Sequence, residues 1–96
     1  MKTDVEYKQQ MRLLRGLANE TRLKIIDRLH EGECHVGELV RVIGCDQSTV
    51  SKHLAILRGV GVVEDERRGN TVVYHLVTPC VVNFFSCASE VIRERG

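Results

Sequence analysis

The fold of this chain is decided by the stretch VIGCDQSTVSKHL, residues 42–54. Gly44 can end one helix and Asp46 can cap the next, so that a short turn joins the two. The outward positions of the second helix carry short hydrogen-bonding side chains and one lysine, with no acidic group after Asp46. A helix that enters the major groove of DNA presents its N-terminal residues to the base edges. The candidate DNA-reading residues are Gln47, Ser48, Thr49, Ser51, Lys52 and His53.

Three earlier segments have the apolar spacing that is typical of helices. Residues 5–17 are expected to form the first helix. Asn19 is a good N-cap for a second helix that runs through His30 and stops at Gly32. Residues 36–43 are expected to form the third. The helix that carries the DNA-reading candidates is therefore the fourth.

After Gly61 the pattern changes to β-branched runs at residues 62–67 and 71–76. The segment between them, residues 68–70, contains glycine and is expected to turn a hairpin. The tip of such a hairpin is a cationic point suited to the DNA backbone or the minor groove. The candidate DNA contacts of the hairpin are Arg67, Arg68 and Asn70.

A last helix is expected after Thr78 and Pro79, which suit the N-cap and the first helical position. It carries more apolar surface than the core of so small a chain must cover, which favours a homodimer. The alternative is that this helix closes the core of the monomer, and both can hold for different faces. The candidate interface residues are Val81, Phe84, Phe85, Ala88 and Ile92.

The order of elements predicts a mainly α fold with a β-hairpin wing. This is a winged helix-turn-helix of about five helices and a two-stranded wing, paired as a homodimer through its terminal helices. The 96 residues fit a single domain, 1–96. The net charge of +1 argues against a polybasic tail but leaves DNA binding open. Since no apolar run approaches the ~18 residues of a membrane helix, and the N-terminus lacks a signal-peptide pattern, we expect a cytoplasmic protein with no membrane partner.

Three segments resemble the ArsR/SmtB family of metal-sensing repressors. They are ANETRLKII at residues 18–26, QSTVSKHLAILR at 47–58, which is similar to the family's recognition helix, and RRGNTVVYHL at 67–76, which is similar to its wing. The resemblance covers roughly residues 10–78, with the motifs in the family's order. It implies a homodimeric repressor that binds a palindromic double-stranded operator and is released by an inducer.

The sensing sites of that family are not reproduced at their usual positions. A Cys-x-Cys pair at the start of the third helix is broken, because His35 and Gly37 stand at its positions and Cys34 comes one residue early. A pair of cysteines near the end of the recognition helix is replaced by Ile56 and Val60. The last helix has no His or Asp for a zinc, nickel or cobalt site. A thiol site of another arrangement is therefore expected.

The candidate ligands are Cys34, Cys80 and Cys87. Soft thiolates favour trivalent arsenic or antimony, cadmium, lead, zinc or copper(I) over hard ions. Cys80 and Cys87 share one helix face but are separated by about 10 Å along its axis, at ~1.5 Å per residue. One ion binds both only if the first turn unwinds, since a zinc–sulfur bond is about 2.3 Å long. The link at residues 33–35 is expected to pair with the wing near Leu76, which brings Cys34 toward Cys80.

We expect DNA binding to need no cofactor, and a soft metal(loid) ion (arsenite, antimonite, cadmium, lead or zinc) to act as inducer, with no small organic substrate. One alternative is a redox sensor, because Cys80 near a helix N-terminus is a reactive position and could form a disulfide or polysulfide with Cys34 or Cys87. Another is a winged helix that docks on protein instead of DNA. An enzyme is least expected, because the adjacent Cys34 and His35 have no orienting partner. Cys45, in the turn, is excluded as a ligand.

Overall fold

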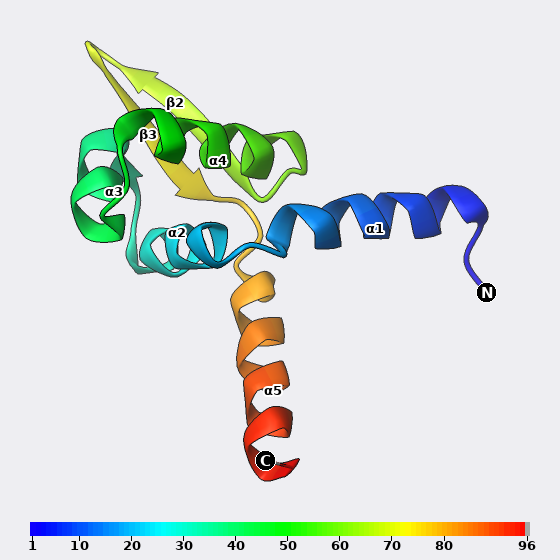
Figure 1. Ribbon diagram of the computed structural model, residues 1–96. Helices are drawn as coiled ribbons and strands as arrows, with labels where there is room; N and C mark the ends of the chain where they lie inside the picture. Colours follow the sequence, from blue (N-terminus) through cyan, green and yellow to red (C-terminus); the bar gives the residue numbers. More distant parts are fainter. Residues whose placement is uncertain (96) are drawn as a thin grey trace.

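Side-chain caps fix the start of three helices in the computed structural model, which describes residues 1–95. Thr3, Asn19 and Asp46 each accept a hydrogen bond from the backbone N–H three residues later, at 3.2, 3.1 and 3.3 Å. Such caps satisfy N–H groups that the helix itself leaves unpaired. In chain order the elements are α1 (Asp4–Leu17), α2 (Glu20–Glu31), β1 (Cys34–His35), α3 (Val36–Ile43), α4 (Gln47–Gly59), β2 (Val63–Arg68), β3 (Thr71–Leu76) and α5 (Cys80–Arg95), as Figure 1 shows.

The wing has one strand more than the sequence predicts. Its antiparallel strand order is β1-β3-β2, so the short β1 pairs with the edge of β3 that the hairpin leaves open. Cys34 lies opposite Tyr74, two residues from the predicted position at Leu76. The link between α2 and α3 is therefore tied to the base of the wing, and the winged helix-turn-helix architecture is confirmed with a three-stranded sheet.

The core forms where α2, α3 and α4 meet the base of the wing. Ile25 and Ile26 of α2, Leu39 of α3 and Leu57 of α4 are completely buried. Val63, at the start of β2, is also completely buried, whereas the rest of that strand is exposed. The base of the wing is therefore part of the core, and its tip extends away from it (Figure 1).

The start of α5 differs from the prediction. The helix begins at Cys80, and the backbone carbonyls of Thr78 and Pro79 accept from the N–H groups of Val81 and Val82, both at 3.1 Å. The Thr78 hydroxyl is buried and has no hydrogen-bond partner among residues 1–95, so it does not cap the helix. Backbone carbonyls, and not the expected hydroxyl, therefore start α5.

The two terminal helices leave the body in different directions (Figure 1). The radius of gyration is 14.6 Å, compared with about 12.5 Å for a compact chain of this length. The first ten residues are exposed throughout, and in α5 only Val81 is fully buried. Within residues 1–95 no helix is both long and apolar enough to cross a bilayer. The apolar surface that the chain does not cover by itself is thus concentrated on α1 and α5.

Candidate nucleic-acid interface and thiol sites

The turn before α4 fixes the N-terminus of the helix that the sequence assigns to DNA. Gly44 adopts φ 83°, a left-handed conformation that favours glycine, and its N–H donates to the Val40 carbonyl at 3.0 Å. The Asp46 carboxylate accepts from the Thr49 N–H at 3.3 Å. Hydrogen bonding by the side chain of Thr49, and to a lesser extent by its backbone, lowers the pKa of Asp46. The one acidic group of the segment is therefore used inside the turn and is not presented on the outward face.

One face of α4 is buried and the other is open. Val50, Leu54 and Leu57 are at most 1% exposed and hold the helix against the core. From Gln47 to Gly59 the helix has no acidic residue. Of the predicted reading residues, Gln47, Ser48, Ser51 and Lys52 are exposed, and Thr49 and His53 are half-buried. The outward face thus offers hydrogen-bonding groups and a cation with no carboxylate to repel a phosphate.

Sequence reasoning missed one residue of this face. Ile56 is 42% exposed and lies one helical turn after Lys52. An apolar side chain on a reading helix can contact the methyl group of thymine. The i, i+4 spacing from Lys52 is the signal that could have identified it.

His53 is turned toward the protein. Its Nδ1 lies 3.2 Å from Nη1 of Arg22, which belongs to α2. Burial, together with the Arg22 charge, lowers the pKa of His53, so the ring is held in its neutral form. One ring nitrogen is thus used within the chain, and only the other is left for DNA.

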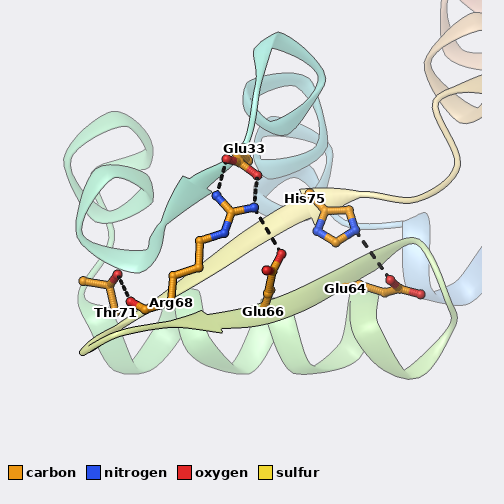
Figure 2. Close-up of polar contacts among 6 residues, drawn as sticks. All are labelled: Glu33, Glu64, Glu66, Arg68, Thr71 and His75. Carbon is orange, nitrogen blue, oxygen red and sulfur yellow. Dashed lines mark hydrogen bonds and ion pairs between the residues drawn. The ribbon is translucent and has the colours of Figure 1, made fainter.

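The wing arginines are in different environments. Arg67 is exposed and has no ion pair within the part of the chain that the structure describes. Arg68 pairs with both oxygens of Glu33, through Nη1 at 2.5 Å and Nη2 at 3.1 Å, and its Nη2 also reaches Glu66 at 3.1 Å (Figure 2). These contacts lower the pKa of Glu33 and raise that of Arg68. Asn70 is exposed beside Gly69, whose φ is 60°.

Arg68 therefore fastens the wing to the link between α2 and β1 in the free chain. Its fork of two parallel N–H groups on a carboxylate has the geometry by which arginine also holds a phosphate. A second contact along the same sheet joins His75 Nε2 and Glu64 Oε2 at 3.5 Å (Figure 2). Sequence reasoning assigned Arg68 to DNA and missed Glu33, because 35 residues separate the pair.

The three candidate thiols lie in two environments. Cys34 is 2% exposed in β1, and burial raises the pKa of its thiol. Cys80 and Cys87 are exposed free thiols on α5, which is helical without a break from Cys80 to Arg95. Within residues 1–95 no three His, Cys, Asp or Glu side chains form a group able to hold a metal ion. One chain therefore does not bring the three sulfurs together, and the start of α5 is not unwound.

The predicted interface residues of α5 divide between two roles. Val81 is buried in the core of its own chain, and Phe85 packs against that core. They close the monomer, which is the alternative that the sequence left open for this helix. Phe84 is 58% and Ile92 70% exposed, while Ala88 is half-buried. Of the five predicted interface residues of α5, only part is therefore available to a partner chain.

The helix α1 has an open apolar face as well. Tyr7, Met11 and Leu14, spaced i, i+4 and i+7 on one side of the helix, are all more than 40% exposed. Side chains of this kind on a projecting helix mark a protein–protein contact more often than a solvated surface. The unpartnered apolar surface of the chain is thus carried by both of its terminal helices.

The two helices joined by a tight turn and the three-stranded wing beside them define a protein of the winged helix-turn-helix class. Residues 19–65 match the family model described as "Bacterial regulatory protein, arsR family". With a relative 31% identical over 95 residues, the chain belongs to this family.

That relative is the uncharacterized HTH-type transcriptional regulator Rv0081 of Mycobacterium tuberculosis, and the match covers 98% of this chain and 83% of Rv0081. The crystal structure of Rv0081 superposes with a TM-score of 0.82 at 30% identity, covering 96% of this chain and 93% of that one. The HTH-type transcriptional repressor SmtB of Mycobacterium tuberculosis is 45% identical over 64 residues, which are 67% of this chain and 47% of SmtB.

A further solved structure is described as the homodimeric winged helix-turn-helix DNA-binding domain of Mb0332 from Mycobacterium bovis. It superposes with a TM-score of 0.83 at 30% identity and covers 98% of this chain and 90% of that one. Because the likeness extends over nearly the whole chain in both structures, it includes the projecting terminal helices as well as the body.

Proposed function

We propose that the chain is a homodimeric repressor that binds double-stranded operator DNA through α4 and the wing. The observation that carries the proposal is the outward face of α4, which is free of acidic groups and starts at a capped helix N-terminus. Gln47, Ser48, Thr49, Ser51 and Lys52 would contact bases and phosphates, and Arg67 and Asn70 the backbone beside them. The description of SmtB as a repressor and of Mb0332 as a DNA-binding domain supports this role.

Dimerisation would use the exposed faces of α1 and α5. Phe84 and Ile92 on α5, with Tyr7 and Met11 on α1, are the apolar side chains that the monomer leaves in water. A twofold axis between such faces places two reading helices about one DNA turn apart, which a palindromic operator requires. The homodimeric state of Mb0332 supports this arrangement.

For the inducer we propose a soft metal(loid) ion, such as trivalent arsenic or antimony, cadmium, lead or zinc, bound by cysteine thiolates. Cys80 and Cys87 are the accessible thiols, and both lie on the helix that also offers a face to the partner. Cys34 would join them only if β1 released its thiol from the core. Binding at α5 would change the dimer and thereby the spacing of the two reading helices.

The DNA arm of this proposal is tested with an operator selected from a random duplex library by the purified protein. The variant Lys52→Ala should lower operator affinity and reduce the slope of log affinity against log salt by about 0.9, the value for one lost phosphate contact. Lys24→Ala is the matched control, because Lys24 is an exposed lysine on another helix, α2, where it pairs with Glu20. Equal affinity and slope in Lys52→Ala and the parent would contradict the assignment of α4 to DNA.

The sensing arm is tested on reduced protein under anaerobic conditions. Arsenite or cadmium should release the operator from the parent and from Cys45→Ser, but not from Cys80→Ser or Cys87→Ser. Release by oxidant or polysulfide alone would establish the redox alternative instead. An unchanged metal response in both α5 variants would place the site elsewhere.

A further inference from the structure

Arg22 belongs to the segment at residues 18–26 that identifies the family, yet the proposed DNA and thiol sites give it no role. Its side chain leaves α2 and makes three contacts. Nε donates to the Gly16 carbonyl at 2.6 Å, and Nη2 donates to the Arg15 carbonyl at 3.3 Å. Nη1 lies 3.2 Å from Nδ1 of His53 on α4. One half-buried guanidinium therefore touches α1 and the candidate reading helix together.

The chemistry of these contacts is specific to arginine. The last carbonyls of α1 form the negative end of the helix dipole, so a cationic donor fits there. The Arg15 carbonyl also accepts from the N–H of the C-cap residue Ala18, at 3.4 Å. A guanidinium can only donate, and therefore Nδ1 of His53 must accept. The neutral ring then carries its proton on Nε2. A lysine has a single charged nitrogen and cannot span the three acceptors in one geometry.

A second contact, independent of Arg22, joins the same two helices. A Cβ built on Gly16 would lie 2.9 Å from Cγ2 of Val60, the residue that ends α4. Glycine at this position thus lets the end of α1 approach the end of α4 more closely than any other residue would allow. The contact through Gly16 and the contact through Arg22 engage α4 at two points along its length.

We infer that Arg22 is a positioning residue for DNA recognition: it locks the recognition helix α4, through His53, to the C-terminal end of α1. This inference rests on the proposed function, in which α1 contributes to the dimer and α4 reads DNA. Contact with α1 then determines the orientation of α4, and because α1 takes part in the dimer, the packing of the two chains determines the direction of both reading helices. His53 then serves DNA binding through its ring orientation, with Nε2–H as the one donor left free.

The test compares Arg22→Lys with the parent, and Lys24→Ala serves as a surface control on the same helix. Each protein is checked for folding by circular dichroism and for dimerisation by sedimentation. Affinity is then measured for the selected operator and for an unrelated duplex of equal length. We expect Arg22→Lys to stay folded and to lose about tenfold in operator affinity, the scale of one charge-assisted hydrogen bond, with the unrelated duplex changed less than twofold.

Two further measurements separate positioning from loss of structure. Nitrogen NMR should show an unprotonated Nδ1 on His53 in the parent and a mixture of ring tautomers in Arg22→Lys. In a double-mutant cycle, adding Arg22→Lys to His53→Ala should cost no further operator affinity. If Arg22→Lys does not fold, the ring tautomer of His53 in the parent carries the test, and a protonated Nδ1 there would overturn the inference.

An equal loss on both duplexes, or parental affinity and an unchanged His53 tautomer in Arg22→Lys, would overturn the inference. Failure of the proposed function looks different. In that case the parent itself would not distinguish any selected duplex from unrelated DNA, while the tautomer of His53 would still report whether Arg22 holds the ring.

Discussion

Replacing Gly16 by alanine sets two effects of known size against each other. In a helix interior alanine is more favourable than glycine by about 0.8–1.0 kcal/mol, and this gain is smaller near the helix end where Gly16 lies. The new Cβ, however, would stand 2.9 Å and 3.1 Å from the two methyl groups of Val60. Val60 is β-branched and packs against the core, so leaving its preferred rotamer is unfavourable. Overpacking of this kind costs about 1–3 kcal/mol.

The expected net result is a loss of about 1 kcal/mol in the free energy of unfolding, because overpacking exceeds the propensity gain. For a domain of this size that is a fall in Tm of about 4–8 °C. The assay is urea and thermal denaturation at one fixed protein concentration, since dimerisation makes Tm depend on concentration. Gly16→Ala/Val60→Ala should recover part of the loss, because the clashing methyl groups are gone.

Gly59→Ala is the matched control. Gly59 is also helical, and a Cβ there meets nothing within 4 Å. It should therefore stabilise the chain by up to about 0.8 kcal/mol, from helix propensity alone. The reasoning is refuted if Gly16→Ala stabilises the chain as much as Gly59→Ala does, because the contact with Val60 would then not limit the size of the side chain at position 16.

Three other outcomes follow from the contacts of the wing, the reading helix and the core. Glu33→Gln with Glu66→Gln removes both carboxylates that hold Arg68 and should free it for phosphate. Affinity for duplex DNA should rise and the slope of its salt dependence should steepen by about 0.9, whereas weaker binding would mean that the pairs serve DNA only by holding the wing. Because the pKa of His53 is lowered in the folded chain, the unfolded chain binds a proton at this residue at a higher pH than the folded chain does. The free energy of unfolding should therefore fall as the pH drops below about 6.5. Urea titrations at pH 5–8 should show this fall in the parent, and His53→Gln should remove it. In Cys45→Ser, which removes the half-buried thiol of the turn, a thiol-reactive dye should modify the two exposed cysteines of α5 at once and Cys34 only on unfolding; fast labelling of a third thiol in the folded variant would contradict the burial of Cys34.

The parts of the fold that the sequence predicts are those set by neighbouring residues. Asn19 and Asp46 cap the helices they were expected to cap, since each bond spans only three residues. The link at residues 33–35 pairs with the wing as expected, but its register, with Cys34 opposite Tyr74, was not predicted. The orientation of His53 depends on an arginine 31 positions away. Such long-range contacts leave no periodic pattern in a sequence. Thr78 shows the converse, because a suitable local residue was not used once backbone carbonyls supplied the same bonds.

The same distinction explains why the thiol site was only partly predictable. The residue types identify soft-metal chemistry, but the distances between sulfurs depend on where β1 and α5 lie. Cys34 is held in the core, and the two thiols of α5 remain separated along an unbroken helix. Two thiols from each chain of a dimer would supply enough ligands where one chain cannot. Under the proposed function, a metal site would therefore have to include the partner's α5.

Under the proposed function, a signal from such a site would reach DNA through contacts within one chain. The helix α5 packs through Val81 and Phe85 on the core to which α2 belongs, and its outer face is the one offered to the partner. Arg22, on α2, joins α1 to His53 of the reading helix. A change in how two chains pack at α1 and α5 would therefore be passed to α4 by two contacts, that of the Arg22 guanidinium with His53 and that of Gly16 with Val60. Cutting this link should uncouple the sites: Arg22→Lys should still bind cadmium through α5 with parental stoichiometry, yet lose most of the effect of the metal on operator affinity.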